Sequence, residues 1–314
     1  MDRTRHFLTK MGLPPGDPHD LPTSTKRFPD GAQYRVEIPS TENAAALAAI
    51  IEEAERSHLT IHRVSQGSGV LLLTDDEIRE MRNLALAHHM EVSLFARPNA
   101  AWDTGAMVTA SGGKTIAPRL RGQEQLIYCL EDVRRAAALG IRSVLLADEG
   151  VLWVAGEMRK EGLLPASMQF KISVMMASAN PASIRVMERL GADTFNIPTD
   201  LTLAQIAAIR QAVDIPLDIY IEAPDDLGGF VRIYEIAEIV RVAAPVYLKF
   251  GLRNAPNIYP VGKHLEQASL ALSRERVHRA RIGLDLLARY YPEAIQSLSG
   301  ATGLALPTAE ERDM

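Results

Sequence analysis

Short apolar, β-branched runs alternate with longer amphipathic stretches along most of this chain. The runs have the length of buried strands, and the stretches between them carry apolar residues at helical spacing. In the predicted helix over residues 42–56, for example, Leu47, Ile50 and Ile51 share one face. Thr74-Asp75-Asp76-Glu77 has the form of a capping box before a helix over residues 78–88. Strand–helix alternation of this kind is typical of a parallel sheet with right-handed crossovers.

Eight apolar runs fit this pattern. The predicted strands are residues 34–38, 60–65, 91–96, 143–147, 169–175, 194–197, 217–221 and 246–250. Eight units of roughly 28 residues favour a closed (β/α)8 TIM barrel. An open, doubly wound sheet is the alternative, but residues 39–42 (PSTE) after the first run are not the glycine-rich phosphate loop that would favour it.

The same pattern divides the chain into three parts. We expect an irregular lead over residues 1–33, a barrel catalytic domain over residues 34–299 and a loose tail over residues 300–314. A helix over residues 265–290 would complete the outer ring.

Alternation within the strands places many ionisable side chains on the face that meets the barrel interior. The inward set is Arg35, Glu37, Lys171, Asp218, Glu222 and Lys249. Because the seventh, eighth and first strands are neighbours in a closed barrel, Glu222, Lys249 and Glu37 should lie side by side near its top. Active sites of such barrels lie at the carboxyl ends of the strands. A lattice of ion pairs that only ties the strands together is the structural alternative.

Three kinds of chemistry fit these residues. A divalent metal ion (Mg²⁺, Mn²⁺ or Zn²⁺) could be held by Glu37, His62 and Asp148 from different strands. A Schiff-base lysine is the second, because burial or a neighbouring cation lowers the pKa of Lys171 or Lys249.

Proton transfer on a bound small molecule is the third kind. Glu222 would act as general acid or base, while Lys249 and Arg63 hold an anionic group. We therefore name Glu222, Lys249 and Lys171 as catalytic candidates.

The loops at the predicted mouth supply further candidates. The substrate-binding candidates are Arg63, Arg97, Asn196, Arg253 and Asn254. Residues 97–122 form a long, glycine-containing connection of the kind that serves as a lid. Residues 65–69 (SQGSG) offer backbone N–H groups for an anion.

Composition narrows the function classes. The net charge is −5, without a basic stripe, so no nucleic-acid partner is evident. Cys129 is the single cysteine and reads as an inert core thiol, which excludes a disulfide within the chain. No secretory signal or membrane segment is evident, so we expect a cytoplasmic protein. A homo-oligomer is left open.

Four segments resemble the peptidase U32 family, the collagenase-like peptidases. They are residues 62–69 (HRVSQGSG), 198–206 (PTDLTLAQI), 222–230 (EAPDDLGGF) and 249–254 (KFGLRN). The resemblance covers roughly residues 34–290 and is to short members made of the barrel alone. It implies a barrel and a peptidase label. Some U32-like proteins use a cysteine-ligated iron–sulfur cluster, which the lone Cys129 excludes here.

The leading expectation is therefore a hydrolase, a U32-like peptidase, that uses acid–base or metal-assisted chemistry on a peptide or small molecule. The alternatives are a lyase or isomerase for a small carboxylated or phosphorylated metabolite, and a non-catalytic barrel that serves as an assembly partner.

Overall fold

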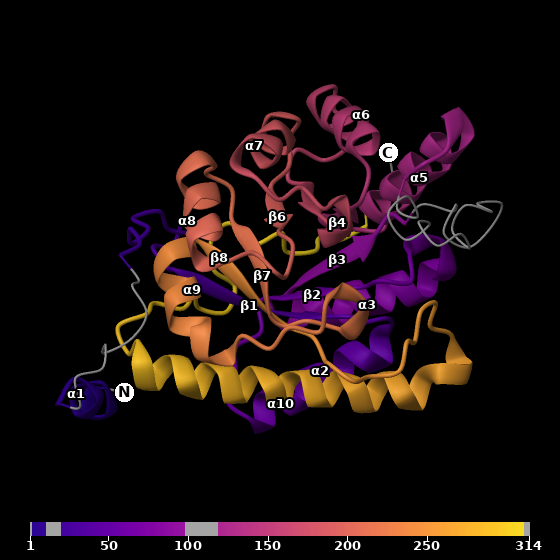
Figure 1. Ribbon diagram of the computed structural model, residues 1–314. Coiled ribbons are helices and arrows are strands. Elements are labelled where there is room, and N and C mark those ends of the chain that lie inside the picture. The colour runs from indigo at the N-terminus through magenta and orange to yellow at the C-terminus, as the bar shows by residue number, and fades with distance from the viewer. Residues whose placement is uncertain (1, 11–19, 98–118, 311–314) are drawn as a thin grey trace.

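The computed structural model describes residues 2–10, 20–97 and 119–310. Eight parallel strands pair in chain order and close between β8 and β1, which confirms the (β/α)8 barrel (Figure 1). The strands are β1 (Tyr34–Pro39), β2 (Arg63–Ser65), β3 (Glu91–Phe95), β4 (Ser143–Leu146), β5 (Gln169–Ile172), β6 (Thr194–Asn196), β7 (Leu217–Glu222) and β8 (Val246–Phe250).

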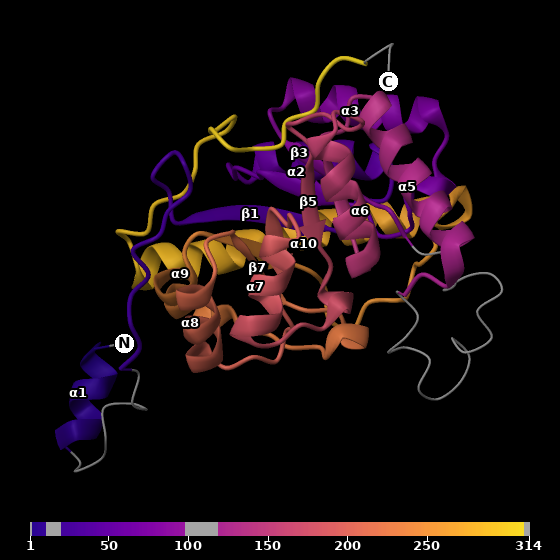
Figure 2. The same ribbon diagram turned by 90° about the horizontal axis from the view of Figure 1, so that it is seen from above.

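Helices surround this barrel and cover the outward faces of the strands (Figures 1 and 2). They are α2 (Ala44–Arg56), α3 (Asp75–Ala87), α5 (Gly122–Ala138), α6 (Glu149–Lys160), α7 (Pro181–Arg189), α8 (Leu203–Ala212), α9 (Ile236–Ala243) and α10 (Glu266–Tyr290). The capping box at Thr74 is confirmed, with reciprocal hydrogen bonds to Glu77 at the start of α3. Long α10 packs against α2 and α9 and completes the ring. No helix among the described residues is long and apolar enough to cross a membrane.

Two predicted strands are shorter than the apolar pattern indicated. β2 begins at Arg63, so His62 precedes it, and β5 ends at Ile172. Residues Val174–Met176 instead form a 3₁₀ turn, in which the Ser173 hydroxyl accepts a hydrogen bond from the Met175 N–H. A side chain that competes for backbone hydrogen bonds in this way ends the ladder early.

The chain around the barrel differs from the expected lead and tail. α1 (Asp2–Lys10) is a helix within the predicted irregular lead, and both views show it apart from the ring (Figures 1 and 2). The predicted lid over residues 97–122 lies largely outside the described residues. The expectation of a loose tail is wrong up to residue 310, because this segment runs from the end of α10 to α3, where Glu310 pairs with Arg79 (yellow in Figure 2).

This segment closes the amino-terminal end of the barrel. Buried Arg35 donates to Ser297 Oγ at 3.0 Å and to the Thr302 carbonyl at 2.7 Å. Buried Glu91 accepts from the Ala305 N–H at 2.9 Å. Buried charges need such partners, so the tail is ordered by the groups that it satisfies. The carboxyl ends of the strands remain as the end at which a ligand can enter.

His62 lies at the closed end. Its Nδ1 accepts from the Val36 N–H at 3.0 Å, and its Nε2 lies 2.8 Å from the Ser297 carbonyl, to which it donates in this tautomer. Burial lowers the pKa of His62 to about 4. The folded protein therefore keeps this ring neutral at pH values where the unfolded chain has bound a proton.

We predict that His62 makes the protein acid-sensitive between about pH 6.5 and pH 4. Unfolding takes up a proton in this range, so the free energy of unfolding falls as the pH falls, by up to about 3 kcal/mol from this residue. Urea unfolding of the native protein and of His62→Gln at several pH values measures the difference. Parallel pH profiles for the two proteins would show that His62 does not cause the loss.

Candidate functional site

The strand registers sort the inward side chains into layers, which alternate strands of a TIM barrel supply in turn. The central layer comes from the odd strands and holds Glu37, Ser93, Lys171 and Asp218. The layer towards the carboxyl ends comes from the even strands and holds Ser65, Leu145, Asn196 and Lys249. The layer towards the closed end holds Arg63, Ser143, Thr194 and Tyr247.

The Glu37 carboxylate is the hub of this interior. Its Oε1 is shared by the Lys171 ammonium, the Lys249 ammonium at 3.3 Å and the Ser65 hydroxyl at 2.6 Å. Its Oε2 lies 3.3 Å from Arg63 Nη1. Burial by itself would raise the pKa of Glu37, but the three neighbouring cations outweigh burial and hold it well below its usual range. Glu37 therefore stays ionised at neutral pH.

Arg63 joins the central layer to the one below it. Its guanidinium pairs with Glu91 and lies 3.2 Å from Asp218 Oδ1. It also stacks on the Tyr247 ring, 3.5 Å from the centroid. A charge held by two carboxylates and an aromatic face is fixed in place, so Arg63, predicted to bind an anionic substrate, is occupied by the protein's own anions.

The two inward lysines differ in their surroundings. Lys171 lies 3.3 Å from Asp218 in addition to its contact with Glu37. Burial lowers the pKa of Lys171 to about 8, the Glu37 carboxylate opposes this shift, and the Lys249 ammonium adds to it. Lys249 instead donates to Asn196 Oδ1 and lies over the Tyr220 ring, 4.4 Å from the centroid. Lys171 is thus the amine that a modest rise in pH deprotonates.

Glu222 does not join this cluster, and its predicted place beside Lys249 is wrong. The pairing of β7 with β8 has an irregularity between Tyr220 and Glu222, which breaks the period-two alternation. The Glu222 carboxylate accepts from the Arg253 N–H at 2.8 Å and lies 3.3 Å from Arg279 on α10.

The three predicted metal ligands do not meet. Glu37 lies in the interior, whereas His62 stands at the closed end. Asp148 caps α6, accepting from the Gly150 N–H at 2.8 Å. Within residues 2–10, 20–97 and 119–310, no group of three or more His, Cys, Asp or Glu side chains could hold a metal ion. The sequence pattern cannot tell the two ends of neighbouring strands apart, which is why these residues seemed to converge.

The loop candidates lie at the rim. Arg253 and Asn254 both contact Asp225, through the Arg253 Nε at 3.2 Å and through the Asn254 N–H. Arg97 donates to the Gly67 carbonyl at 3.4 Å. These contacts hold the rim loops to one another, and a role in substrate binding stays a prediction.

The predicted anion nest already holds an anion of the protein. The Glu42 carboxylate accepts from the Gly67 N–H at 2.9 Å and from the Ser68 N–H at 2.8 Å. Burial raises the pKa of Glu42, and the hydrogen bonds oppose the shift. The nest is therefore a structural anchor for the loop after β2.

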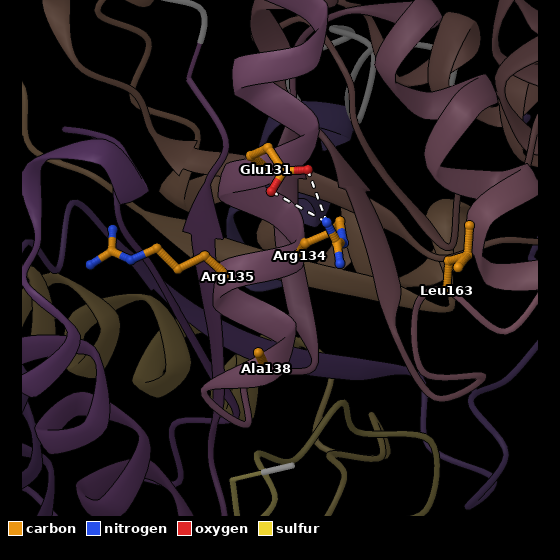
Figure 3. Close-up of a pocket in the computed structure, with 5 residues that line it drawn as sticks. All are labelled: Glu131, Arg134, Arg135, Ala138 and Leu163. Carbon is orange, nitrogen blue, oxygen red and sulfur yellow. Dashed lines mark hydrogen bonds and ion pairs between the residues drawn. The ribbon is translucent and has the colours of Figure 1, made fainter. Parts of the chain in front are cut away.

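Two hollows lie outside the barrel interior. A hollow of about 190 Å³ on the outer face of α5 is lined by Glu131, Arg134, Arg135, Ala138 and Leu163 (Figure 3). Glu131 and Arg134 pair with each other there, and Arg135 extends to the other side of the helix (Figure 3). A larger one, about 570 Å³, lies between the segments after β6 and β7 and α10. Neither is lined by the lysines or by Glu37.

Sequence reasoning missed the aromatic side chains of this site. Tyr247 supports Arg63 and donates to Glu91 at 3.0 Å, and Tyr220 lies against Lys249. Alternation had put both residues on inward faces, so their place beside a cation was the available signal.

The closed barrel with an ion-filled interior defines the chain as an enzyme-like (β/α)8 protein. Residues 119–223 match the family model described as Peptidase family U32, so the chain belongs to the U32 family. The search of curated proteins found no match.

Among solved structures, the chain is similar to three barrel proteins. The U32 peptidase Mk0906 has 16% identity, with 66% of this chain and 73% of that chain covered and a TM-score of 0.40. The putative copper homeostasis protein CutC from Streptococcus agalactiae has 15% identity, coverage of 68% and 98%, and a TM-score of 0.45. Thiamine phosphate pyrophosphorylase from Pyrococcus furiosus has 12% identity, coverage of 81% and 98%, and a TM-score of 0.43.

We predict that Glu37→Gln destabilises the protein by roughly 3–5 kcal/mol at neutral pH, because three buried cations lose their common carboxylate. Urea unfolding measures the change. Glu52→Gln is the matched control, since exposed Glu52 pairs with Arg274 at the surface and should cost less than about 1 kcal/mol. Equal losses in the two variants would contradict a central role for Glu37.

Proposed function

We propose that this protein is a cofactor-independent enzyme that acts on a small carbonyl compound, by lysine chemistry at the Lys171–Glu37–Lys249 cluster. The reaction class that follows is that of a lyase or isomerase. The observation that carries the proposal is the meeting of two buried lysines on one carboxylate oxygen, with the pKa of Lys171 lowered to about 8. A desolvated lysine beside a second cation is the arrangement that activates an amine as a nucleophile.

The chemistry balances with the groups present. The neutral Lys171 amine attacks the carbonyl carbon and forms a C–N bond. The carbinolamine then loses its oxygen as water and becomes a protonated imine, and the Lys249 ammonium is the nearby donor for the departing hydroxide. Glu37 stays ionised, so it stabilises the positive imine and does not act as the acid. The imine draws electrons from the adjacent carbon, which permits proton abstraction or bond cleavage there.

Access from the carboxyl ends of the strands supports this use of the interior. Leu145 faces inward in the layer towards these ends and is partly exposed, whereas its strand neighbours Val144 and Leu146 are fully buried. A small molecule that enters beside β4 therefore approaches Lys171, which is paired in register with Leu145.

Peptide hydrolysis is the second candidate, and the U32 family match over residues 119–223 favours it. That segment carries Lys171, Asn196 and Asp218, so a U32-like hydrolase would use part of the same interior. Cleavage of a mixed peptide library, with Lys171→Met and Lys249→Met beside the native protein, tests this candidate directly. Cleavage that survives both substitutions would place any peptidase activity elsewhere.

We predict that borohydride traps a carbonyl compound on Lys171. The protein is incubated with a panel that includes pyruvate and glyceraldehyde, reduced, digested and analysed by mass spectrometry. The peptide that contains Lys171 should gain the mass of the reduced adduct, and Lys171→Met should abolish it. Lys160→Met is the matched control, because Lys160 is exposed on α6. Adducts confined to exposed lysines would refute the imine proposal.

The rate of trapping should rise with pH, since only the neutral amine reacts. With a Lys171 pKa of about 8, the neutral fraction increases about tenfold between pH 7 and pH 9 and then levels off. Trapping rates at constant ionic strength across this range measure the profile. A rate that is still rising steeply above pH 10 would point to an ordinary surface lysine.

A further inference from the structure

The central layer has one corner that differs from the rest. Glu37, Lys171 and Asp218 are linked by ion pairs, and Ser93 occupies the remaining position. Ser93 is fully buried, and among the residues that the structure describes its hydroxyl has no hydrogen-bond partner. The same holds for the hydroxyl of Ser143, which is paired in register with Ser93 on β4 and is 1% exposed.

Both hydroxyls face the barrel interior. Val92 and Leu94 flank Ser93 and belong to the apolar layer between strands and helices. Ser143 is paired in register with Ser93, so its side chain lies on the same face of the sheet. Ser65, in register with Ser93 on the other side, donates to Glu37. The serines therefore form a polar wall along β2, β3 and β4, of which the Ser65 end already touches the lysine cluster.

Buried hydroxyls without a partner are uncommon, because each costs free energy unless it is hydrogen-bonded. Two of them in register, below the partly exposed Leu145 and beside Lys171, make a built recess for an oxygen atom of a ligand. Serine is small, so this corner of the layer holds less side-chain volume than the corners filled by Lys171 and Glu37.

The charges of the interior determine what kind of group fits the recess. The cations Arg63, Lys171 and Lys249 are balanced by the anions Glu37, Glu91 and Asp218, three against three. A further buried charge would lack a partner, at high cost. Serine hydroxyls both donate and accept hydrogen bonds. The recess therefore suits an uncharged hydroxyl group.

We propose that Ser93 and Ser143 bind a hydroxyl group of the substrate, which is accordingly a hydroxyaldehyde or hydroxyketone whose carbonyl carbon lies at Lys171. This inference rests on the proposed lysine chemistry and adds the substrate class and two specificity-determining residues. Neither serine takes part in bond making: they position the carbonyl compound through its hydroxyl.

The test compares matched probes that differ in the hydroxyl groups. Dihydroxyacetone and acetone are each trapped with borohydride on the native protein, Ser93→Ala and Ser143→Ala. Loss of a hydrogen bond to the probe should slow trapping of dihydroxyacetone about tenfold and leave trapping of acetone unchanged. Ser269→Ala is the matched control, because the Ser269 hydroxyl on α10 is also buried and unpartnered among the described residues but lies outside the barrel.

The outcomes separate this inference from the proposed function. If both probes are trapped at Lys171 and the serine variants slow them equally or not at all, the imine chemistry stands and the serine recess is refuted. If neither probe is trapped, the proposed function fails, and calorimetric titration with dihydroxyacetone then decides the recess. Binding that Ser93→Ala abolishes and Ser269→Ala retains supports the recess, whereas equal binding or none overturns it.

Discussion

The buried carboxylate of Glu37 is the constraint on which the rest of the interior depends. An ionised group at the centre of a barrel is tolerated only if its charge is matched and its lone pairs accept hydrogen bonds. Arg63, Lys171 and Lys249 meet this demand from three other strands. Because these partners reach Glu37 only when β8 pairs with β1 in the observed register, the ion network and the closure of the barrel specify each other.

The same network sets the reactivity of its members. Burial without compensation would leave either a neutral lysine or an unstable fold. Here the carboxylates hold Lys171 charged enough to stay buried, while burial and Lys249 keep its pKa within reach of neutral pH. The stability of the interior and the availability of an amine are thus governed by the same distances, and a substitution that improves one alters the other.

Alternation in the sequence was sufficient to find most of this interior. Arg35, Lys171, Asp218 and Lys249 all face inward, because a period of two holds wherever the ladder is unbroken. It failed at Glu222, where the irregularity after Tyr220 turns the side chain towards α10. A sequence shows the period of a strand and does not show where a bulge interrupts it.

Height along the barrel axis was the other quantity that the sequence could not supply. His62 and Asp148 both flank predicted strands, yet one lies at the closed end and the other caps α6 beyond β4. The register that separates them depends on the tilt common to all eight strands, which no single segment encodes. The fold was therefore predictable from local patterns, whereas the grouping of side chains required the closed sheet.

The family match gains its meaning from this closure. Residues 119–223 contain Lys171 and Asp218, but Glu37 and Lys249 lie on β1 and β8, outside the matched segment. The matched strands alone would leave a lysine without the carboxylate oxygen that it shares with Lys249. The lysine pair is consequently a property of the whole barrel, and likeness over the matched segment alone does not carry the chemistry: a relative needs an acid on β1 and an amine on β8 as well.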